Sequence, residues 1–351
     1  MPRDNYFGGV ATIIKNYLSN RDVFEKYGYD ISLFDYFSEK LYKLKNSKWY
    51  YHIHAIFQTK ALLRRIKGEK DSIIHIHTSR GWLLLKDLFL ARAIKKRRGN
   101  TIGLTIHFCD LDKILYRNPK IRKLEIQFIK KYIDFLVILS RQTIMEFEQV
   151  GVESSKLYLL YTFHNFDVPQ MPVKSKDKVN LLFVGSFDQR KGLIDLLSTL
   201  LDINLPFHFN ICGGYSDVSL KEKIEDYLQK LDGKADILGY VSGEQKKRVF
   251  EESDILILPS YGEGLPIVIM EALAAGCVVV STSVGAIPEI IRKENGALIK
   301  PGDTRALKES ITNYLRNDKL LRETQNNNFN YGRKFSTSAN IRSLCEIYNQ
   351  L

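Results

Sequence analysis

Cysteine is scarce in this chain, with four residues among 351. The four lie far apart and form neither a C-x-x-C pair nor a Cys/His ligand spacing, which argues against a disulfide framework and predicts reduced, buried thiols. Long hydrophobic runs are also missing, because no apolar stretch reaches the roughly 18 residues that a membrane-spanning helix needs. The first residues do not have the pattern of a signal peptide. We therefore expect a cytoplasmic protein that is soluble or peripheral to a membrane.

A complete metal-ligand set is also missing. The seven histidines include two alternating pairs, His52/His54 and His75/His77. Alternation in a β-like run places both members of a pair on one face of a strand. No carboxylate or cysteine completes either set, so the sequence predicts no metal site.

Positive charge is unevenly distributed along the chain. Residues 1–165 contain 29 Lys and Arg against 16 Asp and Glu, whereas residues 166–351 contain 23 against 24. The excess is concentrated in residues 40–48, 60–70, 95–98 and 113–131. A basic face mixed with apolar residues suits an anionic membrane surface or a nucleic acid. No nucleic-acid-binding motif is present, so we expect a membrane partner and no nucleic acid, although each cluster by itself is typical of a solvated helix face.

The order of the apolar runs predicts a doubly wound α/β protein. Five β-like runs in the first half, YDISLFDY, SIIHIHTS, NTIGLTIHF, IDFLVILS and KLYLLYTF, alternate with helical patterns. A polar segment with two prolines, residues 166–178, interrupts this rhythm before it restarts. We expect two Rossmann-like domains, 1–165 and 166–335, that face a central cleft, and a final helix, 336–351, that can pack back on the first.

Two glycines, Gly8 and Gly9, precede the first helical pattern. Glycines at a helix N-terminus let backbone N–H groups approach a phosphate, but the same residues fit a plain tight turn. Only six residues precede Phe7, so the strand that usually leads into such a loop is expected to be missing.

Residues 254–276, DILILPSYGEGLPIVIMEALAAG, predict a strand, an acidic loop and a helix that Pro266 opens. Glu263 falls on the loop and Glu271 in the helix. Carboxylates bind vicinal hydroxyls well because each oxygen accepts a hydrogen bond. Glu263 also fits a simpler role at the positive end of the helix dipole. Glu271 lies in an apolar run, where an unpaired charge is costly.

Residues 185–192, GSFDQRKG, follow a predicted strand and precede a helix. The adjacent cations Arg190 and Lys191 and the helix N-terminus would together form a diphosphate clamp. A surface turn is an equally good interpretation of this stretch alone.

Four segments, GSFDQRKG, LGYVSGEQ, SYGEGLPIVIMEALAAG and STSVGAIPEII, in this order resemble the C-terminal half of the family 4 retaining glycosyltransferases, which have the GT-B fold. The two glutamates match that family's E-x7-E motif. The first half resembles the family more weakly, through GGVAT, IIHIHT, LTIHF, VILS and HNFD.

The resemblance implies a role for each matching residue and no metal cofactor. It places the donor diphosphate at Gly8, Gly9, Arg190 and Lys191, and the base at Gly239, Tyr240 and Val241. It places the transferred sugar at His107 and Glu263 and the ribose at Glu271, with Gly264 and Leu265 also in the donor site. His107, Glu263 and Lys191 would take part in catalysis. The chain departs from the family at Ser186, where Arg is frequent, and at Phe166, where Gly is usual.

We therefore expect a retaining hexosyltransferase with a nucleotide-sugar donor, UDP-linked, and a growing glycan or lipid-linked acceptor at the inner face of the cell membrane. Two alternatives remain: a sugar-nucleotide epimerase of similar fold, and a non-catalytic partner subunit of a glycosyltransferase complex.

Overall fold

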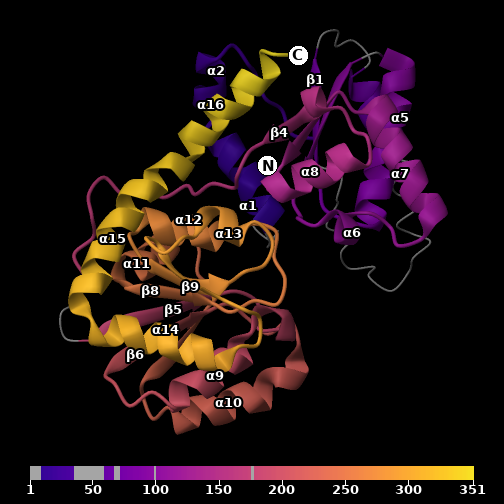
Figure 1. Ribbon diagram of the computed structural model, residues 1–351. Helices are drawn as coiled ribbons and strands as arrows, with labels where there is room; N and C mark the ends of the chain where they lie inside the picture. Colours follow the sequence, from indigo (N-terminus) through magenta and orange to yellow (C-terminus); the bar gives the residue numbers. More distant parts are fainter. Residues whose placement is uncertain (1–8, 35–58, 67–71, 99, 175–177) are drawn as a thin grey trace. The chain divides into compact units, whose positions relative to one another are not determined.

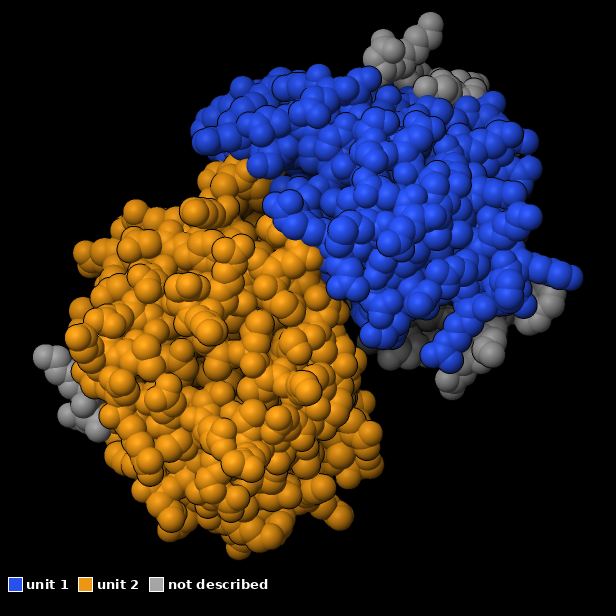
Figure 2. All heavy atoms as spheres, in the orientation of Figure 1, with its two compact units in different colours: residues 1–160, 341–351 blue, residues 161–340 orange. Residues whose placement is uncertain are grey.

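A computed structural model describes residues 9–34, 59–66, 72–98, 100–174 and 178–351. The chain divides into two compact units, which Figure 2 colours separately. Unit 1 contains residues 1–160 and 341–351, and unit 2 contains residues 161–340. Gly8 lies outside the described residues, as do His52 and His54.

Unit 1 has a parallel sheet in the order β1-β2-β3-β4. Its strands are β1 (Ile73–Thr78), β2 (Thr101–Ile106), β3 (Phe135–Ile138) and β4 (Leu157–Leu159). Its helices are α1 (Gly9–Ser19), α2 (Arg21–Lys26), α5 (Trp82–Arg98), α6 (Leu111–Ile114), α7 (Pro119–Tyr132) and α8 (Arg141–Gln149), and most of α16 (Thr337–Tyr348) also belongs to it. Figure 1 shows α5 and α7 side by side, and the two helices are in contact.

The core of unit 1 explains why these segments form strands and helices. Apolar residues at helical spacing in α5 and α7, such as Leu88, Ile94 and Ile129, pack with the fully buried strand residues Leu104 and Leu136. Burial of apolar surface on both faces of a parallel sheet is what its continuous hydrophobic runs predict.

One predicted strand is wrong. Residues 29–34, the described part of YDISLFDY, form no strand, and residues 35 and 36 lie outside the described part of the chain. The Arg65 guanidinium donates to the Leu33 carbonyl oxygen (3.0 Å), and the Tyr29 hydroxyl donates to Asn349 Oδ1 (2.7 Å). Tertiary contacts of this kind override a local β propensity.

Unit 2 has a six-stranded parallel sheet in the order β10-β9-β8-β5-β6-β7. The strands are β5 (Val179–Val184), β6 (Phe207–Cys212), β7 (Ala235–Gly239), β8 (Ile255–Leu258), β9 (Val278–Thr282) and β10 (Gly296–Ile299). The helices are α9 (Leu193–Leu201), α10 (Lys221–Lys230), α11 (Gly243–Glu252), α12 (Ile267–Ala274), α13 (Ile287–Ile290), α14 (Thr304–Arg316) and α15 (Asp318–Gly332).

The strand order of unit 2 fixes where a ligand can bind. β5 lies next to β8, and the chain runs outward from this pair in both directions. The chain connections that follow these two strands lead to opposite sides of the sheet, and open α/β sheets bind ligands at such a switch point, outside the carboxyl ends of the strands. The predicted α/β class, with two parallel-sheet units, is confirmed. Among the described residues, none of the helices combines the length and hydrophobicity needed to cross a bilayer.

Candidate functional site

The loops after β5 and β8 meet at this switch point in unit 2. The first loop contains a short 3₁₀ turn, Gln189–Lys191, which Asp188 caps by accepting from the Lys191 backbone N–H (3.1 Å). Gly192 follows with φ 72°, and a Cβ atom there would collide with the Pro259 carbonyl oxygen of the second loop. A glycine is therefore required for the two loops to approach this closely.

Arg190 and Lys191 of the first loop both contact Glu263 of the second loop. The Lys191 Nζ atom lies 2.6 Å from Glu263 Oε1, and the Arg190 guanidinium lies 3.5 Å from the same oxygen. Arg190 also donates to the Gly262 carbonyl oxygen at 2.9 Å. The lysine and glutamate side chains are only 14% and 9% exposed, whereas half of the arginine side chain is exposed. Glu263 thus contacts both cations, and the Arg190 guanidinium also lies 3.8 Å from Asp188 Oδ2. Cations held in this way are suited to charge-assisted hydrogen bonds with a phosphate.

The backbone of the loop that contains Glu263 packs against Gly285 and Ala286. Gly285 has φ 56°, and a Cβ atom there would collide with the carbonyl oxygens of Glu263 and Gly264. The Ala286 N–H donates to the Gly264 carbonyl (2.9 Å), and the Leu265 side chain is buried. These contacts fix the position from which Glu263 projects.

Glu271 lies in α12, which begins at Ile267 with Pro266 as its N-cap residue, one position later than predicted. Its Oε1 atom accepts from Lys246 Nζ of α11 at 2.6 Å. Its Oε2 atom is buried and has no hydrogen-bond partner among the described residues. A buried carboxylate oxygen without a donor is costly, so it is suited to accept hydrogen bonds from a ligand. The sequence did not single out Lys246, because its partner lies 25 positions away.

The turn after β7 lies near this carboxylate. Burial and the charge of Glu271 raise the pKa of the Tyr240 phenol, although 60% of the residue is exposed. Gly239 has φ 70°, and its carbonyl oxygen accepts from the Gly213 N–H (2.8 Å), while Val241 is buried. Tyr240 is therefore displayed beside the pair formed by Lys246 and Glu271.

His107 lies in unit 1, directly after β2. Its Nε2 atom is 2.9 Å from His77 Nδ1, and the two rings are stacked with centroids 5.1 Å apart. His75 contacts Thr105 Oγ1 (2.6 Å) and Tyr348 Oη (2.7 Å). Burial lowers the pKa of His77 to about 4, and burial with the neighbouring His77 lowers the pKa of His107 well below its usual value. Both imidazoles are therefore neutral at physiological pH.

The predicted residues fall into three groups. Unit 2 brings Arg190 and Lys191 together with Glu263, and it brings Tyr240 near Glu271. His107 joins two other histidines in unit 1, and Gly9 is exposed at the start of α1. Ser186, at the departure from the family pattern, donates to Asp188 Oδ2 (2.6 Å). The described residues contain no cluster of three or more side chains that could hold a metal ion.

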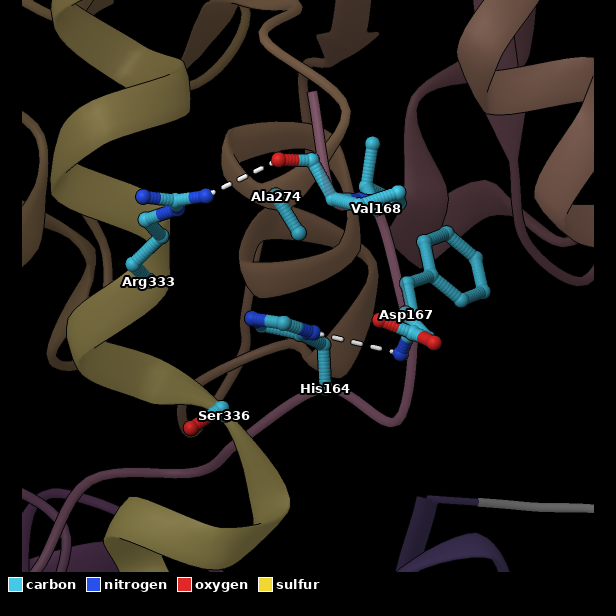
Figure 3. A pocket seen from close by; sticks show the side chains of 8 residues that line it. His164, Asp167, Val168, Ala274, Arg333 and Ser336 are labelled. Atoms are coloured by element: carbon cyan, nitrogen blue, oxygen red, sulfur yellow. Dashed lines mark hydrogen bonds between the residues drawn. The ribbon is translucent and has the colours of Figure 1, made fainter. Parts of the chain in front are cut away.

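A cavity of about 280 Å³ lies elsewhere in unit 2 (Figure 3). His164 lies in its wall with both ring nitrogens engaged, since Nε2 donates to the Gly332 carbonyl (3.1 Å) and Nδ1 accepts from the Phe166 N–H (3.2 Å). Arg333 donates to the Pro169 carbonyl oxygen at 3.0 Å. These polar groups hold the segment after residue 163 against the end of α15, so the cavity is a consequence of that packing.

Comparison with known proteins relates unit 2 to a family. Residues 167–333 match the family model for glycosyl transferases group 1, and this range lies within unit 2. An uncharacterized 41.2 kDa protein from the cps region of Klebsiella pneumoniae is 24% identical over 364 residues, which cover 97% of this chain and 96% of that protein. The amylovoran biosynthesis glycosyltransferase AmsK of Erwinia amylovora is 34% identical over 140 residues, 37% of this chain and 34% of AmsK.

The fold is similar to that of a solved structure over almost the whole chain. The Anabaena protein HepE, determined in complex with UDP-glucose, superposes with a TM-score of 0.73 at 13% sequence identity and covers 99% of this chain and 98% of HepE. The GT-B fold expected from the resemblance is confirmed.

Proposed function

We propose that this chain is a retaining glycosyltransferase that moves a hexose from a nucleotide-sugar donor, UDP-linked, to a growing glycan or lipid-linked acceptor in surface polysaccharide or glycoconjugate synthesis. The observation that carries the proposal is the arrangement of Arg190, Lys191 and Glu263 at the switch point of a parallel sheet. The match of unit 2 to glycosyl transferases group 1, and the UDP-glucose bound by a protein of similar fold, support it.

The cations would act on the donor diphosphate. Arg190 and Lys191 neutralise its charge and stabilise the nucleoside diphosphate as it leaves, since opposite charge at the leaving group lowers the barrier to departure. Once the phosphates take over the contacts to the cations, the carboxylate of Glu263 is released to accept hydrogen bonds from the sugar hydroxyls. Gly264 and Leu265 line the same loop, and His107 is assigned to the transferred sugar.

The carboxylate of Glu271 would bind the ribose. Its unpartnered Oε2 atom can accept from a ribose hydroxyl while Oε1 stays paired with Lys246. Tyr240, beside this carboxylate, would stack on the base of the nucleotide, and the backbone of Gly239 and Val241 would line the base site. We further propose that the enzyme works at the cytoplasmic face of an anionic membrane, where a lipid-linked acceptor is displayed.

Titration calorimetry of the full chain with UDP-glucose, UDP-galactose, UDP-N-acetylglucosamine and GDP-mannose tests the donor class. Tighter binding of at least one UDP-sugar than of GDP-mannose is the expected result. A chain that binds none of these compounds would contradict the proposal.

NMR of the donor during turnover separates the alternatives. A retaining transferase produces a glycoside with the anomeric configuration of its donor when an acceptor is supplied. Release of UDP with an epimerised free sugar in the absence of any acceptor would indicate an epimerase instead.

A further inference from the structure

Helices α5 and α7 of unit 1 form a surface whose exposed charges are all positive. Each helix contains a single acidic residue, Asp87 in α5 and Glu125 in α7. Both are buried, with exposed fractions of 6% and 0%. We call the exposed side of these two helices the α5–α7 face.

The two acids are directed into the protein by specific partners. Asp87 lies 3.1 Å from the ammonium group of Lys86, and Glu125 Oε2 accepts from the Tyr116 backbone N–H at 2.9 Å. Burial raises the pKa of both carboxyl groups. Neither group can offset the positive charge at the surface.

Exposed lysines make up the charge of the α5–α7 face. The exposed lysines are Lys96, Lys120, Lys123, Lys130 and Lys131. Lys95 and Arg122 are instead paired with Asp134 and Asp112, at 2.7 and 2.6 Å.

Large apolar side chains lie among these cations. Trp82 and Phe89, on one side of α5, are seven positions apart and are 42% and 44% exposed; Leu83 is 38% exposed. The Phe89 ring meets Phe128 of α7 edge to face, with centroids 5.2 Å apart, and the Arg92 guanidinium lies over the Phe128 ring. The exposed Phe89 of α5 thus packs on the buried Phe128 of α7, which joins the two helices beneath the surface.

We propose that the α5–α7 face binds an anionic lipid bilayer, with Trp82 and Phe89 inserted at the level of the headgroups and the lysines in contact with lipid phosphates. Aromatic side chains favour this interfacial zone, and lysines contribute attraction to anionic lipids. Leu83 favours a bilayer over a nucleic acid, because an exposed aliphatic side chain gains free energy in acyl chains and has no ring to stack on a base. This proposal rests on the membrane location proposed above and names the face of the protein that contacts the membrane. Its test needs neither a sugar donor nor an acceptor.

Trp82 provides a direct probe of insertion. The chain has two tryptophans, so a Trp49→Phe variant reports from Trp82 alone. We expect its emission to shift to the blue, and to be quenched by brominated acyl chains, on addition of phosphatidylglycerol vesicles but not of phosphatidylcholine vesicles. Vesicle binding with an unchanged Trp82 spectrum would overturn the assignment of this face.

Charge reversal tests the electrostatic part by a second measurement. Each lysine near an anionic membrane contributes about 1 kcal/mol, so Lys120→Glu/Lys131→Glu should weaken vesicle binding at least about 30-fold. The matched control is Lys223→Glu/Lys293→Glu in unit 2, which changes the net charge equally and should bind vesicles much more tightly than the first variant. Calorimetry with UDP-sugars on the same variants separates failure of this proposal from failure of the proposed activity.

Two outcomes would overturn the proposal in these assays. One is equal loss of vesicle binding in both charge-reversal variants, which would indicate a dependence on net charge alone. The other is a chain that binds single-stranded DNA but not vesicles, and whose DNA binding is abolished by the Lys120→Glu/Lys131→Glu change.

Discussion

Lys246 is the residue that the structure adds to the candidate site. It holds a carboxylate that is 5% exposed, from a helix separated from α12 by a strand and a loop. A lysine in the run GEQKKRVF has no individual sequence signal that would distinguish it from Lys247 beside it. Only the packing of α11 on α12 shows which of the two faces Glu271.

Replacing this lysine should be far more harmful than replacing its neighbour. Lys246→Met leaves the Glu271 carboxylate buried without a partner, which should lower the free energy of unfolding by about 3–5 kcal/mol. Urea unfolding measures the loss. In the control, Lys247→Met, the change should stay below about 1 kcal/mol, because Lys247 lies 3.8 Å from Glu251 on a partly exposed helix face.

Equal effects of the two substitutions would contradict this role. The double variant Lys246→Met/Glu271→Met provides a further check. It should be more stable than Lys246→Met, since it removes the uncompensated charge.

The ammonium group of Lys191 should matter for the reaction itself. Lys191→Ala removes one of the two cations proposed to stabilise the leaving diphosphate, so kcat for sugar transfer should fall about 100-fold or more. Steady-state kinetics with the UDP-sugar identified by calorimetry gives the ratio. The exposed Lys230 of α10, replaced by alanine, is the control and should leave kcat unchanged. An undiminished rate in Lys191→Ala would remove this residue from the mechanism.

At the scale of elements, the side chain of Lys174 connects the C-terminal ends of two helices, α11 and α12. Lys174 is only 7% exposed, and its Nζ atom donates to the carbonyl oxygens of Glu251, Ser253 and Ala275 at 2.7–2.9 Å. These carbonyls lie at the C-terminal ends of α11 and α12. A cation there is favoured by both helix dipoles and supplies donors that the helix ends lack.

Removing this ammonium group should therefore loosen both helices together. Lys174→Met keeps the length of the side chain but leaves the carbonyls without their donor, which should cost about 3 kcal/mol or more in the free energy of unfolding. Urea unfolding is again the measurement. Lys178→Met, at an exposed position four residues on, is the matched control and should be neutral. A stable Lys174→Met variant would show that the helix ends find other partners.

Prediction of elements from the sequence succeeded where local signals agreed with one another. The stretch from β8 to α12 has an apolar run, Pro266 and Gly276, and each of these marks a boundary within one residue of the observed one. The run YDISLFDY also alternates apolar and polar residues from Tyr29 to Leu33, yet its described part is not a strand, because its contacts with distant residues such as Arg65 and Asn349 are not visible in a local pattern. The roles of His107 and Glu271 came from a resemblance, because short-range patterns do not determine which side chains meet.

At the scale of the whole molecule, burial lowers the pKa of histidines in both units, of His164 in unit 2 and of His75, His77 and His107 in unit 1. Three histidines cluster in unit 1, where His75 and His107 pack on either side of His77 and Tyr17 lies beside it. A histidine whose pKa is lowered to about 4 on folding binds fewer protons in the folded chain than in the unfolded one. The stability it provides is therefore complete above about pH 6.5 and is lost as the pH falls towards 4.

Unit 1 should accordingly lose stability in mild acid. Between pH 7 and pH 4 the contribution of His77 alone should be on the order of 3 kcal/mol. Both tryptophans lie in the first 160 residues, so urea unfolding followed by tryptophan fluorescence reports on unit 1. His77→Asn should flatten the pH dependence, whereas His208→Asn in unit 2 should not. An unchanged pH dependence in His77→Asn would show that this imidazole does not control the acid response.

The sequence by itself determined the α/β class, the division into a basic and a neutral half, and the loops that contain Arg190, Lys191 and Glu263. These features follow from local patterns, namely hydrophobic periodicity, turn residues and the number of charges. Only the tertiary structure decided that Lys191 lies against Glu263, that Lys246 holds Glu271, and that Asp87 and Glu125 are buried while the lysines around them are exposed. Such pairings depend on strand order and helix packing, which bring together residues far apart in the chain.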